Sequence, residues 1–179
     1  MAFEAPVASD YNPDQFDSPA AGRYHVAVTK ADEDGGNKGE MILDFEVLAG
    51  SVKDQEGKSH REYFQKTVKA MGRIHQLAIA LGMITKERLK ELQSRGESPV
   101  YDFEAQVNKQ CFIDLQDSVY EGKTRVKADF RLYAIDDPKC ATWKHNAGML
   151  AKGGYKIPAN TSTQQPPAKQ PDVNLTGVL

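Results

Sequence analysis

Apolar and polar residues alternate in five stretches of this chain, and an alternation with a period of two predicts β-strands that bury one face. In the first stretch, Tyr24, Val26 and Val28 occupy alternate positions between polar or small residues. The five stretches are residues 23–30, 40–50, 59–68, 106–117 and 125–135. Polar segments that contain glycine separate several of them, as expected for the turns between antiparallel strands.

The period changes between the third and fourth stretches, where apolar residues recur every three or four positions, as on one face of a helix. The residues of this stripe are Met71, Ile74, Leu77, Ala78 and Leu81. Gly82 follows the stripe, and a glycine at this position commonly ends a helix. A second short helix is predicted over residues 85–96, with Thr85 as its N-cap and Gly96 at its end.

A third helix is predicted near the C-terminus of the chain. Asp137 and Pro138 match an N-cap that is followed by proline at the first helical position. Trp143, Ala147 and Leu150 follow at spacings that would place all three on one face of this helix. The side chains of that face would then pack against the rest of the protein.

The order of the elements is three strands, a helical insertion and a two-stranded hairpin. A helix after the third of five strands is the order of the OB-fold, a small Greek-key barrel that binds oligonucleotides and oligosaccharides. We therefore expect a mainly β fold, namely a five-stranded OB-like barrel with a helical insertion between strands 3 and 4. The expected divisions are an extended arm over residues 1–21, the OB-like domain over 22–135, a C-terminal helix over 136–154 and a flexible tail over 155–179.

Composition and charge limit the classes of function. The chain has 179 residues, a formal net charge of −2 and a pI of about 6.1, so the binding of an anion such as DNA would require a local cationic patch. The two cysteines and four histidines form no zinc-ligand pattern. No nucleophile motif occurs, so we expect neither an enzyme nor a cofactor. The absence of a signal pattern and of a membrane-length apolar run favours a cytoplasmic protein.

Several motifs in the first two thirds of the chain have a recognisable order. The segment "SPAAGRYHVAV" is followed by "GEMILDFEVLAGSVKDQEGKSHREYF", then by "GRIHQLAIALG", and then by two paired strands. Over roughly residues 10–135 this order resembles a family of phage proteins that is catalogued as domain of unknown function 669. The matching positions are Gly22, Tyr24, Val26, Lys38, Gly50 and Gly82.

The resemblance has one departure and several implications. The family usually has a glycine where the fourth strand begins, and this chain has "VNKQ" there. The resemblance implies a phage accessory protein of replication or recombination with an OB-like barrel, similar to single-stranded-DNA-binding proteins. It implies no active site, and it would place the protein in the cytoplasm of a bacterial host.

The last predicted strand has a charged or polar residue at nearly every second position. Water is the ordinary partner of such a face in an antiparallel sheet. A groove for one nucleic-acid strand instead needs cations for the phosphates and aromatic rings for the bases. On this second interpretation, the nucleic-acid-binding residues are Lys30, Lys38, Arg61, Tyr63, Tyr120, Lys123, Arg125, Lys127, Arg131 and Tyr133.

Two further observations bear on this interpretation. The loop after the first strand and the hairpin loop, which flank the ligand groove of OB-folds, contribute four of these residues. Against it, Asp44 and Glu46 make the outer face of the second strand acidic, and the pI lies far below the value of about 9 that is typical of nucleic-acid-binding domains. Three hypotheses therefore stay open: a sequence-independent single-stranded-DNA-binding protein, a protein-interaction adaptor and a virion structural protein on the same barrel.

The C-terminal tip "DVNLTGVL" places apolar residues at the end of a polar linker. Bacterial single-strand-binding proteins have a similar layout, in which a short acidic and apolar tip docks partner enzymes. The residues that would bind a replication or recombination partner here are Asp172, Leu175, Val178 and Leu179. An end without a binding role is the alternative, because the usual cluster of acids is missing. We expect no membrane contact, and a homo-oligomer is compatible with the sequence.

Overall fold

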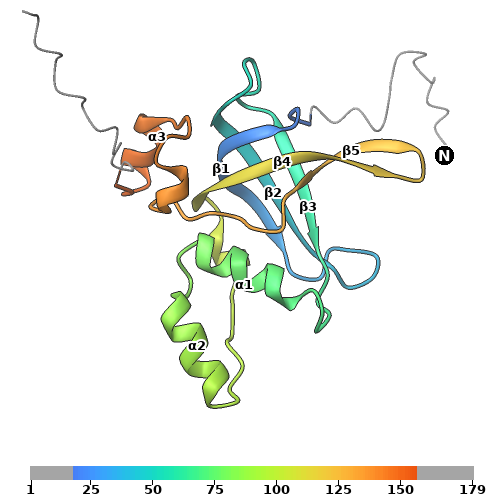
Figure 1. Cartoon of the computed structure of the whole chain (residues 1–179), viewed down its shortest axis with the longest axis vertical. Helices are drawn as coiled ribbons and strands as arrows, with labels where there is room; N and C mark the ends of the chain where they lie inside the picture. Colours follow the sequence, from blue (N-terminus) through green and yellow to red (C-terminus); the bar gives the residue numbers. More distant parts are fainter. Residues whose placement is uncertain (1–17, 157–179) are drawn as a thin grey trace, which may run out of the picture.

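The computed structural model describes residues 18–156, and the remaining residues are drawn in grey in Figure 1. It shows a mainly β protein in which five strands form one open antiparallel sheet with the order β3-β2-β1-β4-β5. The strands are β1 (Gly22–Asp32), β2 (Met41–Gly50), β3 (Ser59–Phe64), β4 (Gln110–Tyr120) and β5 (Lys123–Ala128). The helices are α1 (Met71–Ala80), α2 (Lys86–Ser94) and α3 (Ala147–Lys152), with 3-10 turns η1 (Glu104–Gln106) and η2 (Pro138–Cys140).

Strand β1 lies at the centre of the sheet because it pairs with β2 along one side and with β4 along the other. Its register with β2 shifts after His25 and again after Val28, and such bulges bend a strand and increase its twist. The edge strands β3 and β5 come close together, since the backbone N–H of Ala128 donates a hydrogen bond of 2.9 Å to the Glu62 carboxylate. No backbone ladder joins these two edges within residues 18–156.

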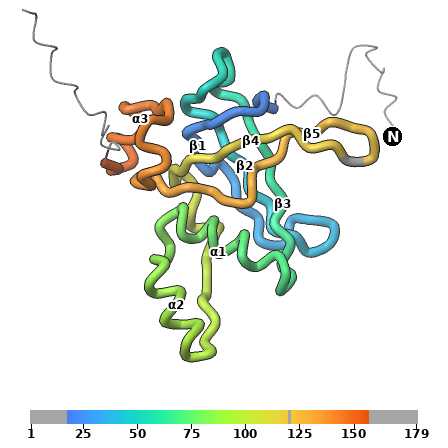
Figure 2. The backbone as a smooth tube through the Cα atoms, viewed as in Figure 1, coloured from blue at the N-terminus to red at the C-terminus, as the bar shows by residue number. Residues whose placement is uncertain are grey.

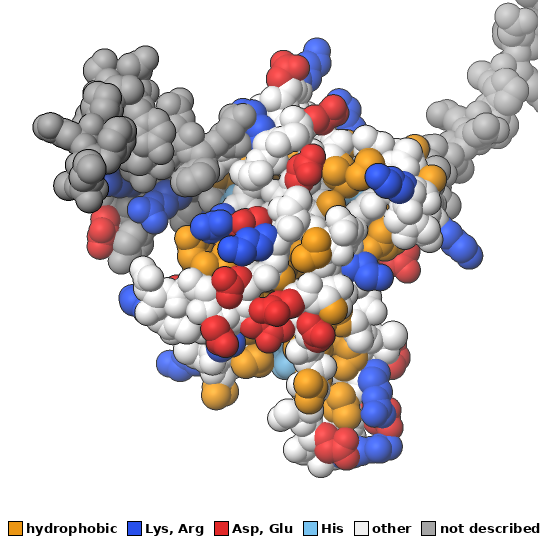
Figure 3. All heavy atoms as spheres, turned by 180° about the vertical axis from the view of Figure 1, so that it is seen from behind, with side chains coloured by type: hydrophobic (Ala, Val, Ile, Leu, Met, Phe, Trp, Pro, Cys, Tyr) orange, Lys and Arg blue, Asp and Glu red, His pale blue; other side chains and the backbone are white. Residues whose placement is uncertain are grey.

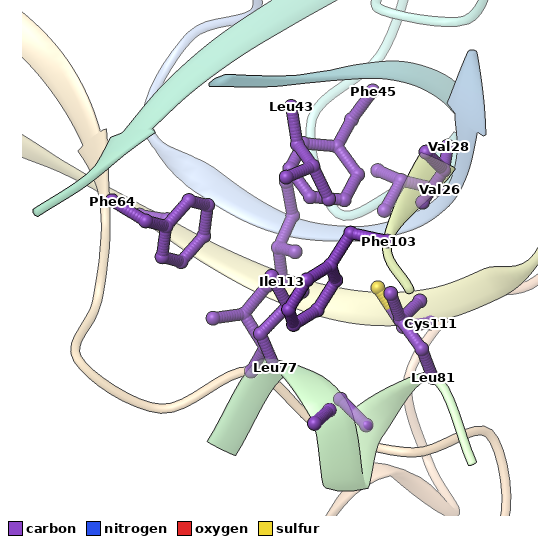
Figure 4. Close-up of a cluster of buried hydrophobic side chains, with 14 of the residues drawn as sticks. Val26, Val28, Leu43, Phe45, Phe64, Leu77, Leu81, Phe103, Cys111 and Ile113 are labelled. Atoms are coloured by element: carbon purple, nitrogen blue, oxygen red, sulfur yellow. The ribbon is translucent and has the colours of Figure 1, made fainter. Parts of the chain in front are cut away.

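The main hydrophobic core lies between the inner face of the sheet and α1. Figure 4 shows Leu77 of α1, and Leu81 directly after the end of α1, beneath Cys111 and Ile113 of β4, with Phe103 beside them. Each of the large apolar side chains buried here contributes about 1.5–3 kcal/mol relative to exposure. The apolar stripe predicted from the sequence is thus the face of α1 that packs against the sheet.

Both predicted helices between β3 and β4 are confirmed, together with their ends. Gly82 follows α1 with a φ of 72°, a left-handed conformation that glycine adopts without steric cost. The Thr85 hydroxyl accepts a hydrogen bond of 3.1 Å from the Arg88 N–H and caps α2. Helix α2 buries only Leu89 and extends away from the sheet (Figure 1).

A second buried cluster covers the outer face of the sheet where β4 begins. Its residues are Phe112, Tyr133, Ile135, Cys140, Trp143 and Leu150. The Trp143 ring centroid lies 5.7 Å from that of Phe112 and 5.3 Å from that of Tyr133. Because this cluster also covers β1, His25 is fully buried, although its place in the alternation predicted a polar, outward position.

The last predicted strand and the last predicted helix are both shorter than expected. Strand β5 ends at Ala128, and the chain then runs back towards α3, forming an isolated bridge between Tyr133 and Phe112 (Figure 2). The continuous helix predicted over residues 136–154 is wrong, because Asp137 caps only η2 and Asn146 caps a separate helix, α3. Tyr133 is buried in the second cluster and does not continue the strand.

No helix within residues 18–156 is long and apolar enough to cross a membrane. The residues predicted to bind a partner protein lie outside the described part of the chain, and they are Asp172, Leu175, Val178 and Leu179. Their role, like that of most of the N-terminal arm, stays a prediction.

Candidate nucleic-acid interface

Strands β3 and β5 form the two walls of a surface groove of about 570 Å3, and the start of α1 lies between them. Residues of β3 from Arg61 to Phe64 line one wall, and residues of β5 from Arg125 to Lys127 line the other. Four of the ten residues predicted to bind nucleic acid meet in this groove, namely Arg61, Tyr63, Arg125 and Lys127. The groove is therefore the candidate interface.

A buried ionic cluster around Glu62 forms the floor of the groove. The Glu62 carboxylate accepts hydrogen bonds of 2.9 Å from His60 Nε2 and from the Ala128 N–H. The Arg73 guanidinium lies 2.8 Å from its other oxygen. Arg73 also donates to the carbonyls of Ala128 at 3.1 Å and Tyr63 at 3.3 Å. These contacts join β3, β5 and α1 where a closed barrel would have a backbone ladder.

The charges within this cluster compensate one another. Burial on its own would raise the pKa of Glu62, but the hydrogen bond from His60, the charge of Arg73 and the Ala128 N–H together lower it below its ordinary value. Glu62 is therefore ionised at neutral pH and compensates the charge of Arg73. The cluster sets the distance between the two walls but offers no free cation to a ligand.

Strand β5 carries a row of cations without carboxylate partners. Lys123, Arg125 and Lys127 are all exposed, and none of them forms an ion pair with any residue in the described range 18–156. Because alternate residues of a strand share one face, successive members of this row lie about 7 Å apart. A row of this kind is suited to the repeated phosphates of an extended nucleic-acid strand.

Two aromatic rings lie open to solvent in the groove. Tyr63 is 48% exposed and Phe130 is 58% exposed. Phe130 occupies an apolar position of the alternation over residues 125–135, which predicts that it faces the core. This prediction is wrong, because the alternation stops when β5 ends at Ala128. The Asp129 carboxylate then accepts the Phe130 N–H at 2.7 Å, which replaces a strand hydrogen bond with a local one. Both rings are placed where an unstacked base can contact them.

One of the predicted residues is buried, and two arginines are paired with carboxylates. Tyr133 was predicted to stack on a base, but it is only 2% exposed, so this prediction is wrong. Arg131 was predicted to share a strand face with the β5 cations, but it lies beyond the strand and pairs with Asp137 at 3.0 Å. Arg61 lies in the groove, where Asp44 holds its guanidinium through bonds of 2.7 and 2.8 Å that raise its pKa.

The loop cations of the predicted site, Lys30, Lys38 and Lys123, do not line the groove. Lys30 lies 4.0 Å from Asp32 at the end of β1, and Lys38 is exposed in the connection to β2. Tyr120 pairs with Lys123 through the backbone at the end of the hairpin, and the Tyr120 side chain is outside what the structure describes. The roles of these residues in binding stay predictions.

The cations of β5 are a local feature of a molecule with mixed surface charge. Figure 3 shows the protein from behind, with Asp and Glu side chains gathered near the middle of that face. This distribution agrees with the formal net charge of −2. Any attraction of a polyanion must therefore come from the groove and its surroundings.

Sequence reasoning missed three residues of the groove, and the alternation contained a signal for one of them. Glu62 occupies the same face of β3 as His60 and Phe64, and all three are buried. A carboxylate at an inward position of a strand needs a buried partner, so the position of Glu62 in the alternation could have predicted a nearby cation. Arg73 and Phe130 had no comparable local signal.

No protein-family model matches this chain, and the curated proteins include no match to its sequence. The resemblance to the phage family therefore depends on its motifs alone and stays a prediction. The functional argument depends on the groove.

Proposed function

We propose that this protein binds single-stranded DNA without sequence preference, in the groove between β3 and β5. The observation that carries the proposal is the meeting of unpaired cations, Arg125 and Lys127, with exposed rings, Tyr63 and Phe130, in one groove. A single strand has phosphates for the cations and accessible base faces for the rings, whereas a duplex conceals most of its base faces in stacking.

The finer architecture and the biological setting belong to the same proposal, namely an OB-like barrel that acts in phage DNA replication or recombination in the host cytoplasm. The sheet order and the position of the helices between β3 and β4 support the OB-like interpretation. Asn108, in the segment where the resembled family has a glycine, has a φ of 73°. Asparagine tolerates this conformation better than most residues, which supports the resemblance at its one point of departure.

The two kinds of contact predict two different dependences on salt. Each phosphate contact of a single strand adds about 0.7 to the slope of log affinity against log salt concentration. Each stacked base contributes about 1–3 kcal/mol, and stacking involves no release of counterions. Binding should therefore weaken as salt rises without vanishing.

Fluorescence anisotropy with labelled oligo-dT and with a duplex of equal length tests the proposal at two salt concentrations. We expect oligo-dT to bind more tightly than the duplex and to bind more weakly at the higher salt concentration. Equal affinity for both ligands, or no binding of either, would contradict the proposal.

A double variant, Arg125→Gln with Lys127→Gln, tests the groove itself. The loss of two phosphate contacts should weaken binding and lower the salt slope by about 1.4. The matched control is Lys53→Gln with Lys90→Gln, which removes the same charge from exposed positions away from the groove. If the control weakens binding as much as the groove variant, general charge and not the groove is responsible.

The alternative is a protein-interaction adaptor that does not touch DNA. The acidic surface in Figure 3 and the extension of α2 away from the sheet favour it. Partners that are retained in a pull-down from nuclease-treated infected cells, together with an absence of DNA binding, would support this alternative.

A further inference from the structure

We propose that the bound strand continues from the groove across β4 to a second group of cations, Arg23, Arg131 and Lys139, which hold its phosphates without stacking its bases. This inference rests on the proposed function, because it extends the path of the same ligand. It assigns a contact role to Arg23 and Lys139, and it places the predicted contact of Arg131 outside the groove.

The register of the sheet places Arg23 on the same outer face as the β5 cations. Lys127 of β5 lies opposite Gln116 of β4. Two residues along β4, Asp114 lies opposite Arg23 of β1. Residues that face each other across a ladder, and residues two apart in one strand, share a face of the sheet. The path from Lys127 to Arg23 thus runs two residues along a strand and crosses from β5 over β4 to β1. This path corresponds to about 12 Å between the Cα atoms of Lys127 and Arg23.

Aromatic rings fix the positions of these cations. The Arg23 guanidinium lies 5.1 Å from the centroid of the Trp143 ring. The Arg131 guanidinium and the Lys139 ammonium lie 5.1 Å and 4.7 Å from the centroid of the Tyr133 ring. The side chains of Arg23 and Arg131 are still 56% and 40% exposed. The cations are therefore ordered before a ligand arrives, which reduces the entropy lost on binding.

The nearby carboxylates leave this group with a net positive charge. Asp114 lies 3.6 Å from Arg23, and Asp137 lies 3.0 Å from Arg131. Lys139 donates a hydrogen bond of 2.7 Å to the Tyr133 hydroxyl and has no ion pair with any residue of the described range 18–156. Three cations thus face two carboxylates. The two carboxylates are mostly buried, but each arginine contacts its partner through one nitrogen and stays partly exposed. Because a guanidinium has five N–H donors, a phosphate can contact either arginine beside its carboxylate.

The second group differs from the groove in what it can recognise. Its rings, Trp143 and Tyr133, are buried in the second cluster, so they cannot stack on bases. In the groove, Tyr63 and Phe130 are open. The second group should therefore contact the sugar–phosphate backbone alone, and its contribution should be independent of the bases.

Three labelled ligands separate the two contributions in an anisotropy assay. The first is oligo-dT of about 5 nucleotides and the second is oligo-dT of about 12, both within the range that one OB-fold covers. The third ligand has the same length as the second, but only a run of dT as long as the first ligand carries bases. All its other nucleotides are abasic. It is made in two versions, with the abasic part at the 5′ end or at the 3′ end. We expect the longer oligo-dT to bind more tightly than the shorter oligo-dT. One of the two versions of the abasic ligand should bind with an affinity similar to that of the longer oligo-dT.

The double variant Arg23→Gln with Lys139→Gln should remove this gain, so that all three ligands bind like the short one. Lys53→Gln with Lys90→Gln is the matched control and should keep the gain. If the double variant fails to fold, as judged by circular dichroism, Lys139→Gln alone should reduce the gain.

The inference is overturned if the variant keeps the full gain with length, or if the abasic ligand binds no better than the short one in either polarity. Failure of the proposed function looks different, since the wild-type protein would then bind none of the three ligands or would bind a duplex of equal length as tightly as oligo-dT.

Discussion

The outer face of the sheet is built from the same kinds of residue at its two ends but with opposite results. At the end formed by β3 and β5, Tyr63 and Phe130 are exposed beside cations. At the end where β4 begins, Tyr133 and Trp143 are buried beneath cations. We refer to these as the open end and the covered end. The difference shows that an aromatic ring next to a cation is accessible to a ligand only where no later segment of the chain covers the ring.

Each end also has a buried polar cluster, and the two clusters differ in charge. The cluster around Glu62 at the open end is ionic. At the covered end, His25 Nε2 donates to the Gln110 side-chain oxygen at 2.9 Å, and His25 Nδ1 accepts the Asn146 N–H at 3.1 Å. Burial is the main reason that the pKa of His25 is lowered to about 4, so this cluster is neutral at pH 7. The two ends should therefore respond differently to substitution and to pH.

The largest expected effect follows from breaking the ionic cluster. Glu62→Ala leaves the buried charge of Arg73 without its partner, and the removal of one member of a buried ion pair costs about 3–5 kcal/mol. Urea denaturation followed by circular dichroism measures the change in the free energy of unfolding. Glu46→Ala, at an exposed position of β2, is the control and should change it by less than about 0.5 kcal/mol. Equal effects of the two substitutions would mean that the cluster does not hold β3 and β5 together.

A pair of ring deletions contrasts the two ends directly. Trp143→Ala should cost about 3–5 kcal/mol of stability because it empties part of the second cluster. Phe130→Ala should cost less than about 0.5 kcal/mol because the ring is exposed, yet it should weaken oligo-dT binding by about 1–3 kcal/mol if the ring stacks on a base. Thermal unfolding and anisotropy, measured on both variants, test the contrast. A large loss of stability in Phe130→Ala would show that its ring is structural.

The main elements of the fold could be predicted because their signals are local. The stripe around Leu77 and the cap at Thr85 depend on residues within a few positions of each other. The alternation in the last predicted strand likewise predicted that Arg125 and Lys127 would point outward, and both line the groove.

The errors of prediction have a common physical cause in contacts between distant parts of the chain. Tyr133 continues the alternation of β5, but its burial depends on Phe112 and Trp143, which the pattern around residue 133 cannot reveal. The pairing of Arg61 with Asp44 likewise depends on the register of β3 against β2. The charge that remains free for a ligand is therefore a property of the folded sheet.

The neutral cluster at the covered end predicts an acid-sensitive stability. The folded-state pKa of His25, about 4, lies below its unfolded value of 6.5, so the folded protein disfavours the protonated form. The contribution of His25 is fully present above pH 6.5 and is lost as pH falls from 6.5 towards 4. The difference of about 2.5 pKa units corresponds to at most about 3 kcal/mol. Urea unfolding between these pH values should show the loss, and His25→Gln should reduce it. An unchanged pH dependence in His25→Gln would assign the loss to other groups.

The smallest expected effect tests whether the cap of α3 contributes to stability independently of the neutral cluster around His25. The Asn146 side chain accepts the Met149 N–H at 3.1 Å, whereas the bond to His25 comes from the Asn146 backbone. Asn146→Ala should therefore cost about 1 kcal/mol through the lost cap and leave the bond to His25 in place. The free energy of unfolding of Asn146→Ala should be lower than that of the wild type by the same amount at pH 7 and at pH 5. Thr85→Ala, which removes the cap of α2, is the control and should also show a loss that does not depend on pH. A loss in Asn146→Ala that differs between the two pH values, when the loss in Thr85→Ala does not, would show that the cap and the His25 cluster act as one unit.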